Sequence, residues 1–194
     1  MTTIAAVQDS QTKELYIASD TYLTCDGTAE VLPLALYPNG KFLVFKTFAV
    51  GISGSIALRT LVKNMITDDP SLDDPDFSNV QTFFESFREY VQKHTDMEQD
   101  KKGAYECDLI YVDDTGVYEA NGWLVAHKKL VSIVGSGWLV AHGAYDALSR
   151  NTDYSTEKLL RAVMETASRK DTGTGGDIIV MKLNFPERPV CLQV

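Results

Sequence analysis

The chain opens with Met1-Thr2-Thr3-Ile4-Ala5-Ala6-Val7, a hydroxyl-bearing entry into an apolar β-strand. If Met1 is removed, Thr2 carries a free α-amino group beside its hydroxyl and becomes a nucleophile with its own base attached. An α-amine has an unperturbed pKa of about 7.7–8.0, so it can accept a proton near neutral pH. The alternative is that Thr2 is an ordinary residue at the start of an edge strand. The nucleophile is favoured if other residues of the chain form a catalytic site around Thr2, and the ordinary strand residue if they do not.

Length and composition predict one globular domain, residues 1–194, without a membrane segment. Hydrophobic residues make up 44% of the chain and charged residues 23%, which suffices for a sizeable core. No apolar run approaches the roughly 20 residues of a membrane helix, and no signal segment opens the chain. The net charge of −9 argues against nucleic acid or an anionic membrane as the main partner.

The cysteines indicate a reducing compartment. Cys25, Cys107 and Cys191 are odd in number and widely spaced, so they suit neither a disulfide framework nor a zinc site. We therefore expect a cytoplasmic protein that needs no metal or other cofactor. A cysteine nucleophile, Cys25 with His94 or His127, is a further alternative, although nothing in the sequence places these residues together.

Two predicted strands at the start of the chain bring a carboxylate toward Thr2. Residues 3–7 and 14–20 have strand character, and the polar segment between them predicts a hairpin. The second strand ends on Asp20, whose carboxylate then lies beside the first residue of its neighbour and can orient charge there. The alternative for Asp20 is a solvated turn residue.

A second hairpin supplies a lysine and a junction between a strand and a helix. Asn39-Gly40 is a strong tight-turn signal and leads into a strand over residues 41–45 that begins with Lys41. A strand over residues 47–53 runs through Gly54 into an amphipathic helix. Backbone N–H groups at the positive end of a helix can stabilise an oxyanion; otherwise Gly54 only permits the turn.

The later elements complete an alternation of strand runs and helix pairs. Ser78-Asn79-Val80-Gln81 has the pattern of a capping box at the start of a second helix. Further strands are predicted over residues 105–112, 117–121, 131–134, 177–183 and 190–194, and helices over 138–149 and 156–170. This order predicts an α+β fold, a four-layer α-β-β-α sandwich of two antiparallel sheets. The hexapeptide GWLVAH occurs at 122–127 and again at 137–142, without a longer repeat around it.

Taken together, these residues resemble the catalytic β-type subunits of the proteasome family of N-terminal nucleophile hydrolases, most closely the bacterial HslV-type peptidases. The bacterial HslV-type subunit likewise begins Met-Thr-Thr-Ile, and the resemblance covers essentially the whole chain. It implies that Thr2 is the nucleophile after removal of Met1. It also implies that Asp20 is the acidic residue of the site, Lys41 its lysine, and Gly54 the donor of the oxyanion N–H.

Two later motifs extend the resemblance. The Gly-Ser-Gly before a helix is present as Gly135-Ser136-Gly137, and the Asp-x-x-Ser-Gly motif as Asp171-Thr172-Gly173-Thr174-Gly175, with Thr in place of Ser. By resemblance, Ser136, Asp171 and Thr174 hydrogen-bond the N-terminus and Lys41 and fix their protonation states.

Substrate contacts follow from the resemblance less directly. Thr24 matches the position whose backbone pairs with substrate, and Ile52 is a candidate for an apolar substrate pocket. The loop before Lys41 is longer than in the family, so Lys41 is assigned from its strand context. Lys46 is the alternative, but it lies too close to Gly54. Tyr22 stands where eukaryotic members carry a basic residue, which bears on the pocket more than on the chemistry.

The resemblance implies a threonine-type peptidase that works on peptide or unfolded-protein substrates inside a homo-oligomeric ring or stacked rings, with an ATP-dependent unfoldase as a possible partner. Two other functions stay open. If Met1 is retained, Thr2 has no free amine, and the chain is an inactive structural or assembly protein of the same fold. Alternatively, it is an N-terminal nucleophile amidase that acts on small acyl amides.

Overall fold

The computed structural model describes residues 2–25, 28–31, 38–54, 56–75, 79–94, 107–122, 125–150 and 153–186. Within these ranges the helices are α1 (Ile56–Asp68), the short 3-10 helix η1 (Pro70–Asp73), α2 (Val80–His94), α3 (Trp138–Leu148) and α4 (Thr156–Lys170). The strands are β1 (Thr3–Gln8), β2 (Leu15–Ser19), β3 (Tyr22–Cys25), β4 (Thr28–Val31), β5 (Phe42–Val44), β6 (Phe48–Gly54), β7 (Cys107–Asp113), β8 (Gly116–Ala120), β9 (Ala126–Lys129), β10 (Val131–Gly135) and β11 (Ile179–Leu183).

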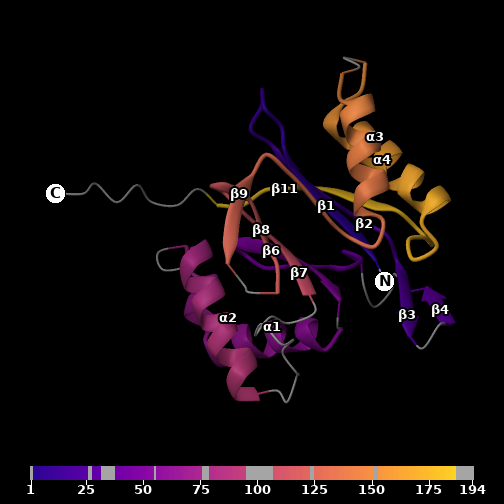
Figure 1. Ribbon diagram of the computed structural model, residues 1–194. Coiled ribbons are helices and arrows are strands. Elements are labelled where there is room, and N and C mark those ends of the chain that lie inside the picture. Colours follow the sequence, from indigo (N-terminus) through magenta and orange to yellow (C-terminus); the bar gives the residue numbers. More distant parts are fainter. Residues whose placement is uncertain are drawn as a thin grey trace.

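The strands form two antiparallel sheets that pack against each other (Figure 1). One sheet has the order β10-β1-β2-β11 and the other the order β5-β6-β7-β8-β9, while β3 and β4 form a small separate sheet. β1 pairs with β2 on one side and with β10 on the other. The first residues of β1 are therefore flanked by the last residues of both neighbouring strands.

Alternating side chains along the strands divide the core into three apolar layers. In β1, Ile4 and Ala6 pack between the two sheets, whereas Ala5 and Val7 pack beneath α3 and α4. The strand β7 divides in the same way, between the inter-sheet layer and a layer beneath α1 and α2. Because successive strand residues point to opposite faces, a strand that is buried on both faces must be apolar throughout.

A helix pair covers the outer face of each sheet, as Figure 1 shows. α1 and α2 lie on the five-stranded sheet, and the buried stripe of α2 includes Phe83 and Phe87. α3 and α4 lie on the four-stranded sheet, and α4 buries Leu160 and Val163. The predicted four-layer α-β-β-α sandwich is therefore confirmed.

Three short strands, β3, β4 and β9, are absent from the sequence prediction. Part of the segment predicted as loop, Thr28–Val31, instead forms β4 and pairs with β3; the Asp26-Gly27 pair between them is a hairpin signal that the loop assignment overlooked. β9 is an additional edge strand. Asn79 caps α2, since its Oδ1 accepts a hydrogen bond from the Thr82 N–H at 2.9 Å. Ser78 and the strand predicted over 190–194 lie outside the described residues.

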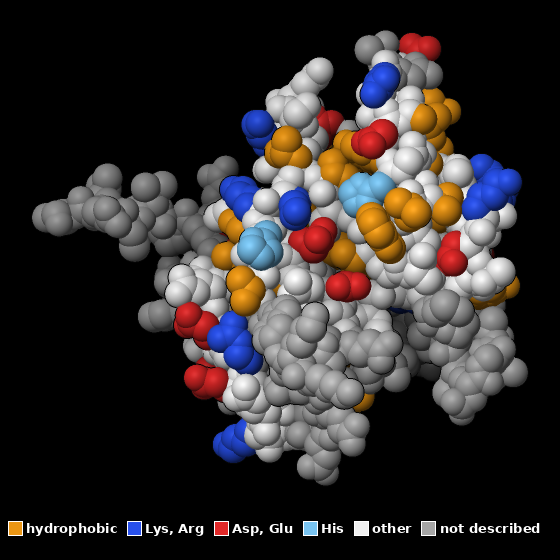
Figure 2. Space-filling model, in the orientation of Figure 1, with side chains coloured by type: hydrophobic (Ala, Val, Ile, Leu, Met, Phe, Trp, Pro, Cys, Tyr) orange, Lys and Arg blue, Asp and Glu red, His pale blue; other side chains and the backbone are white. Residues whose placement is uncertain are grey.

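The two copies of GWLVAH adopt different structures. The first ends in β9, while the second forms the start of α3. Neighbouring segments, rather than the hexapeptide itself, therefore select the local structure. In α3, Trp138 is 50% exposed and Leu139 67% exposed, and Figure 2 shows hydrophobic side chains on the surface of this helical layer.

None of the helices in the described ranges is both long enough and apolar enough to span a bilayer.

Candidate active site

The hairpin of β1 and β2 places Asp20 beside Thr2 and Thr3. β2 ends at Ser19, which pairs with Ile4, and the Asp20 N–H donates to the Thr3 carbonyl at 3.3 Å. Asp20 is completely buried, and Thr2 is only 5% exposed. The predicted juxtaposition of the strand-end carboxylate with Thr2 is present.

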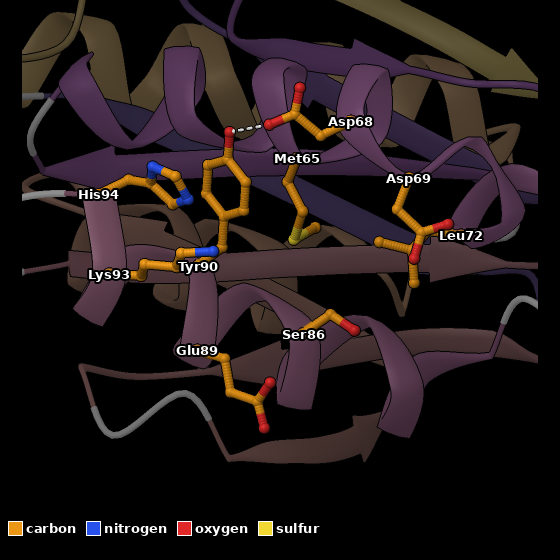
Figure 3. Close-up of a pocket in the computed structure, with 9 residues that line it drawn as sticks. All are labelled: Met65, Asp68, Asp69, Leu72, Ser86, Glu89, Tyr90, Lys93 and His94. Atoms are coloured by element: carbon orange, nitrogen blue, oxygen red, sulfur yellow. Dashed lines mark hydrogen bonds between the residues drawn. The ribbon is translucent and has the colours of Figure 1, made fainter.

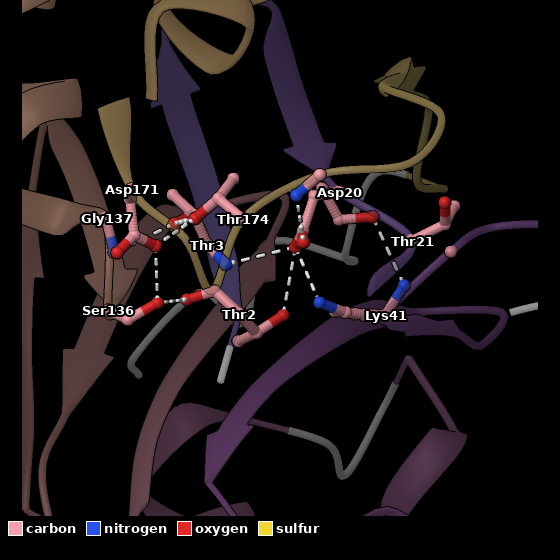
Figure 4. A network of polar contacts seen from close by, with 12 residues as sticks. Thr2, Thr3, Asp20, Thr21, Lys41, Ser136, Gly137, Asp171 and Thr174 are labelled. Carbon is pink, nitrogen blue, oxygen red and sulfur yellow. Dashed lines mark hydrogen bonds and ion pairs between the residues drawn. The ribbon is translucent and has the colours of Figure 1, made fainter. Parts of the chain in front are cut away.

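The Asp20 carboxylate accepts hydrogen bonds from three parts of the chain (Figure 4). Its Oδ1 accepts from the Thr2 hydroxyl at 3.0 Å and from the Thr3 N–H at 3.0 Å. The same oxygen accepts from Lys41 Nζ at 2.6 Å, and its Oδ2 accepts from the Gly175 N–H at 3.1 Å. A buried carboxylate needs such compensation, because losing water without a partner is costly.

Lys41 reaches this carboxylate from the turn that precedes β5. Its side chain is 5% exposed, and its backbone N–H donates to Ser19 Oγ at 3.2 Å. Burial lowers the pKa of Lys41 below its usual value, and the Asp20 charge and hydrogen bond partly oppose this effect. Because the Thr2 hydroxyl and the Lys41 ammonium share one acceptor atom, the ammonium lies close to the hydroxyl. The alternative Lys46 is exposed, and its backbone N–H instead bonds Asp73 at 3.0 Å.

A second group of polar residues holds the backbone of Thr2. The Thr2 carbonyl accepts a hydrogen bond from the Ser136 N–H at 2.7 Å, at the end of β10. Asp171 Oδ2 accepts from the hydroxyls of Ser136 and Thr174, each at 2.6 Å. Burial raises the pKa of Asp171, but these two bonds and the Gly173 N–H outweigh it, so the pKa lies below the usual value. Asp171 therefore stays an anion that is linked to Thr2 through Ser136.

Thr3, Gly135, Gly137 and Gly175 also shape the site, although the sequence analysis gave them no separate role. Thr3 Oγ1 lies 2.5 Å from Thr174 Oγ1 and accepts from the Gly137 N–H at 3.1 Å. A Cβ on Gly135 would lie 1.9 Å from the Thr2 carbonyl oxygen, so only glycine fits there. The sequence did point to the glycines, since Gly135 and Gly137 lie in the Gly-Ser-Gly motif and Gly175 ends the motif that begins at Asp171.

The remaining predicted site residues lie outside this hydrogen-bonded network as far as the described residues show. Gly54 ends β6, is exposed, and has a φ of 107°, which favours glycine. Ile52 is half-buried and packs against the layer beneath α1 and α2. Thr24 lies in β3, where it pairs with Ala29. Hydrogen bonds among the described residues therefore connect Thr2, Asp20, Lys41, Ser136, Asp171 and Thr174, and Gly54, Ile52 and Thr24 take no part in these bonds.

The alternative site built on a cysteine gains no support. His94 ends α2 and stacks on Tyr90, with ring centroids 4.2 Å apart. Both line a cleft between α1 and α2, in which the Tyr90 hydroxyl donates to Asp68 at 2.6 Å (Figure 3). None of the residues that hold Thr2 lines this cleft. The described residues contain no group of three or more His, Cys, Asp or Glu side chains that could hold a metal ion.

Comparison with known proteins identifies the fold. No protein-family model and no curated protein matches the chain. Among solved structures, it resembles BPH of Thiobacillus denitrificans with a TM-score of 0.76 and 20% identity, covering 94% of this chain and 98% of that one. The complex of BPH with epoxomicin gives a TM-score of 0.75 and 19% identity, covering 95% of this chain and 100% of that one. Eukaryotic HslV from Trypanosoma brucei gives a TM-score of 0.62 and 19% identity, covering 93% of this chain and 99% of that one. The chain therefore has the proteasome-like fold of these proteins, as the sequence predicts.

Proposed function

We propose that this chain is a threonine peptidase in which Thr2, made N-terminal by removal of Met1, hydrolyses peptide bonds. The observation that carries the proposal is the shared Asp20 Oδ1, which binds both the Thr2 hydroxyl and the Lys41 ammonium in a buried setting. A nucleophilic hydroxyl needs a nearby positive charge and a base, and a free α-amine on Thr2 supplies the base. The likeness of fold to BPH, which binds epoxomicin, supports the same reading.

The reaction divides into acylation and deacylation. The α-amine, directly or through a water, takes the proton of the Thr2 hydroxyl while Oγ1 bonds to the substrate carbonyl carbon. Lys41 favours this step because its charge stabilises the developing alkoxide. The protonated amine then gives its proton to the leaving amine as the peptide C–N bond breaks. Water then attacks the carbonyl carbon of the resulting acyl-threonine ester. The bond from that carbon to Oγ1 breaks, which releases the acyl group as a carboxylic acid and regenerates the hydroxyl.

Gly54 is the proposed oxyanion donor. Its N–H, at the end of β6 and before α1, would stabilise the negative charge on the substrate carbonyl oxygen. Donors of this kind lower a barrier by about 3 kcal/mol. Thr24 would pair with the substrate backbone, and Ile52 would contact an apolar substrate side chain.

Ser136, Asp171 and Thr174 have a positioning role in this proposal. The Ser136 N–H fixes the Thr2 carbonyl, and the Asp171 anion fixes the Ser136 and Thr174 hydroxyls. An anion held within this network also favours the protonated form of the nearby amine after attack. Holding a nucleophile within a fraction of an ångström matters because small displacements slow a reaction strongly.

We further propose that the chain assembles into a homo-oligomeric ring or stacked rings in the cytoplasm and takes peptides or unfolded proteins as substrates, with an ATP-dependent unfoldase as a possible partner. The half-exposed Trp138 and the exposed Leu139 support an assembly of copies, since neighbouring exposed hydrophobic residues commonly mark contact surfaces. The likeness of fold to HslV also supports this proposal.

The test begins with the N-terminus of the purified protein. Intact mass and N-terminal sequencing should show loss of Met1, and the processed protein should hydrolyse fluorogenic peptides. Thr2→Ala should lower kcat/KM by at least about 1,000-fold, because it removes the nucleophile. Thr67→Ala, which alters an exposed hydroxyl on α1, is the matched control and should leave turnover unchanged.

Each outcome distinguishes a function. Peptide hydrolysis that survives Thr2→Ala would rule out the threonine nucleophile. Retained Met1 with no turnover would favour the inactive assembly protein. Turnover of small acyl amides, but not of peptides, would favour the amidase. Epoxomicin, which binds BPH, is a useful probe: mass spectrometry should detect it on processed wild type and not on Thr2→Ala.

A further inference from the structure

Arg59 contacts the backbone on both sides of Lys41. It is the fourth residue of α1, and its side chain is half-buried. Its Nη1 donates to the Gly40 carbonyl at 2.8 Å, and its Nη2 lies 3.5 Å from the Phe42 carbonyl. The two acceptors belong to the residues immediately before and after Lys41. The guanidinium thus bridges the turn on which the site's lysine stands.

We infer that Arg59 is a positioning residue that fastens the Lys41 turn to α1 and thereby keeps Lys41 closed over Asp20. The bridge requires a planar fork of donors, which arginine has and lysine lacks. The guanidinium is also always charged, so its contacts with the Gly40 and Phe42 carbonyls do not change with pH in the working range. Charge-assisted bonds of this type are stronger than bonds between neutral groups.

Two attachments hold the turn. Residues 38–41 form this turn, with a φ of 56° at Gly40. On the side of the four-stranded sheet, the Lys41 N–H is held by Ser19 Oγ at 3.2 Å. On the side of α1, Arg59 holds the neighbouring carbonyls. Lys41 is thus clamped between β2, which leads into Asp20, and α1.

Arg59 also links two parts of the proposed machinery that are distant in the sequence. Gly54, the proposed oxyanion donor, precedes α1, and Arg59 lies on that helix five residues after Gly54. A shift of the Lys41 turn relative to α1 would move the lysine and the oxyanion donor apart. The contact therefore sets the geometry of acylation without touching substrate.

The inference predicts distinct effects for a variant that keeps the charge and loses the fork. Arg59→Lys should lower kcat about 10- to 100-fold with KM little changed, because a small displacement of a catalytic group has effects of this size. Burial lowers the pKa of Lys41. A looser Lys41 turn would expose the lysine to water, which would raise this pKa back toward its usual value. Since charged Lys41 assists the reaction, the basic limb of the kcat–pH profile should move to higher pH.

Hydrogen exchange measured by mass spectrometry supplies a readout that does not require peptidase activity. In Arg59→Lys, amides of residues 39–44 should exchange at least about 10-fold faster, since local opening governs their protection. Amides of β7 should exchange as in wild type. The control is Arg161→Lys, because Arg161 Nη1 also donates to a backbone carbonyl, that of Ile178 at 3.3 Å, on the other helical layer. It should change none of these quantities.

The inference rests on the proposed function only for its kinetic readouts, so the two can fail separately. If processed wild type has no peptidase activity, the proposed function fails, while hydrogen exchange still tests Arg59. Wild-type exchange at 39–44 in folded Arg59→Lys would overturn the inference. Wild-type kcat and pH profile in an active protein would overturn it too. Should Arg59→Lys fold poorly, Arg59→Gln supplies the second variant.

Discussion

Asp20 is the residue on which the site converges, because a single buried oxygen receives the Thr2 hydroxyl, the Thr3 N–H and the Lys41 ammonium. A carboxylate that is removed from water retains its charge only when such partners are in place. The ion pair with Lys41 is therefore unlike a surface salt bridge, which contributes little. Removing one partner leaves the other charge buried and uncompensated.

Lys41→Met should consequently lower the free energy of unfolding by about 3 kcal/mol, as expected when one member of a buried pair is lost. It should also abolish peptidase activity. The double variant Lys41→Met/Asp20→Asn removes the unpaired charge and should recover at least about 1 kcal/mol, but no activity. Urea unfolding measures the first quantity and peptide turnover the second. Equal stability of Lys41→Met and wild type would show that the pair is not structurally important.

At the scale of elements, the junction between β10 and α3 determines where Thr2 sits. The strand β10 pairs with β1 up to Gly135, and the chain then turns so that the Ser136 and Gly137 N–H groups point at Thr2 and Thr3. Gly135 has a φ of 100°, which side chains rarely tolerate. The close approach to the Thr2 carbonyl leaves no room for a Cβ.

Gly135→Ala should therefore lower the free energy of unfolding by more than about 2 kcal/mol, through steric conflict and backbone strain together. It should also displace Thr2 and reduce peptide turnover. Gly143→Ala, within α3, is the matched control because a Cβ there meets nothing within 4 Å. It should raise stability by about 0.5–1 kcal/mol and leave turnover unchanged. Thermal unfolding and peptide assays test both; a tolerated Gly135→Ala would contradict the assignment.

At the scale of the whole molecule, the four layers give the N-terminus a fixed place. β1 is paired on both sides, and its side chains fill two of the three apolar layers. Thr2 is therefore attached to one of the most constrained strands of the molecule, which is the arrangement that a positioned nucleophile needs. Each copy also carries a net charge of −9, which opposes the association of copies.

Assembly of the proposed ring should accordingly strengthen with ionic strength, because salt screens repulsion between like-charged copies. Sedimentation velocity at about 0.05 M and about 0.5 M salt should show a larger assembled fraction at the higher concentration, where the Debye length falls from more than about 10 Å to about 4 Å. Leu139→Asp is the informative variant, since it adds charge to an exposed hydrophobic surface. A mass that stays monomeric under both conditions would contradict the proposed ring.

Most of the order of elements and the chemical groups of the site could be predicted from the sequence alone. Strand periodicity and turn signals placed Asp20 at the end of a strand beside Thr2, whereas only the family resemblance brought the two glycine motifs to the N-terminus, as the structure has them. These features are local, because they depend on residue types at short spacing. They sufficed for the four-layer fold, although β3, β4 and β9 were missed because short strands carry little periodic signal.

Only the tertiary structure decided which lysine meets Asp20. Lys41 and Lys46 both follow the Asn39-Gly40 turn, and strand context favours Lys41 without showing that its side chain reaches Asp20. The turn is bonded to Ser19 on one side and to Arg59 on the other, which directs Lys41 inward and leaves Lys46 exposed beside Asp73. Those contacts join segments far apart in the chain, and burial lowers the pKa of the lysine, so no local pattern could reveal either.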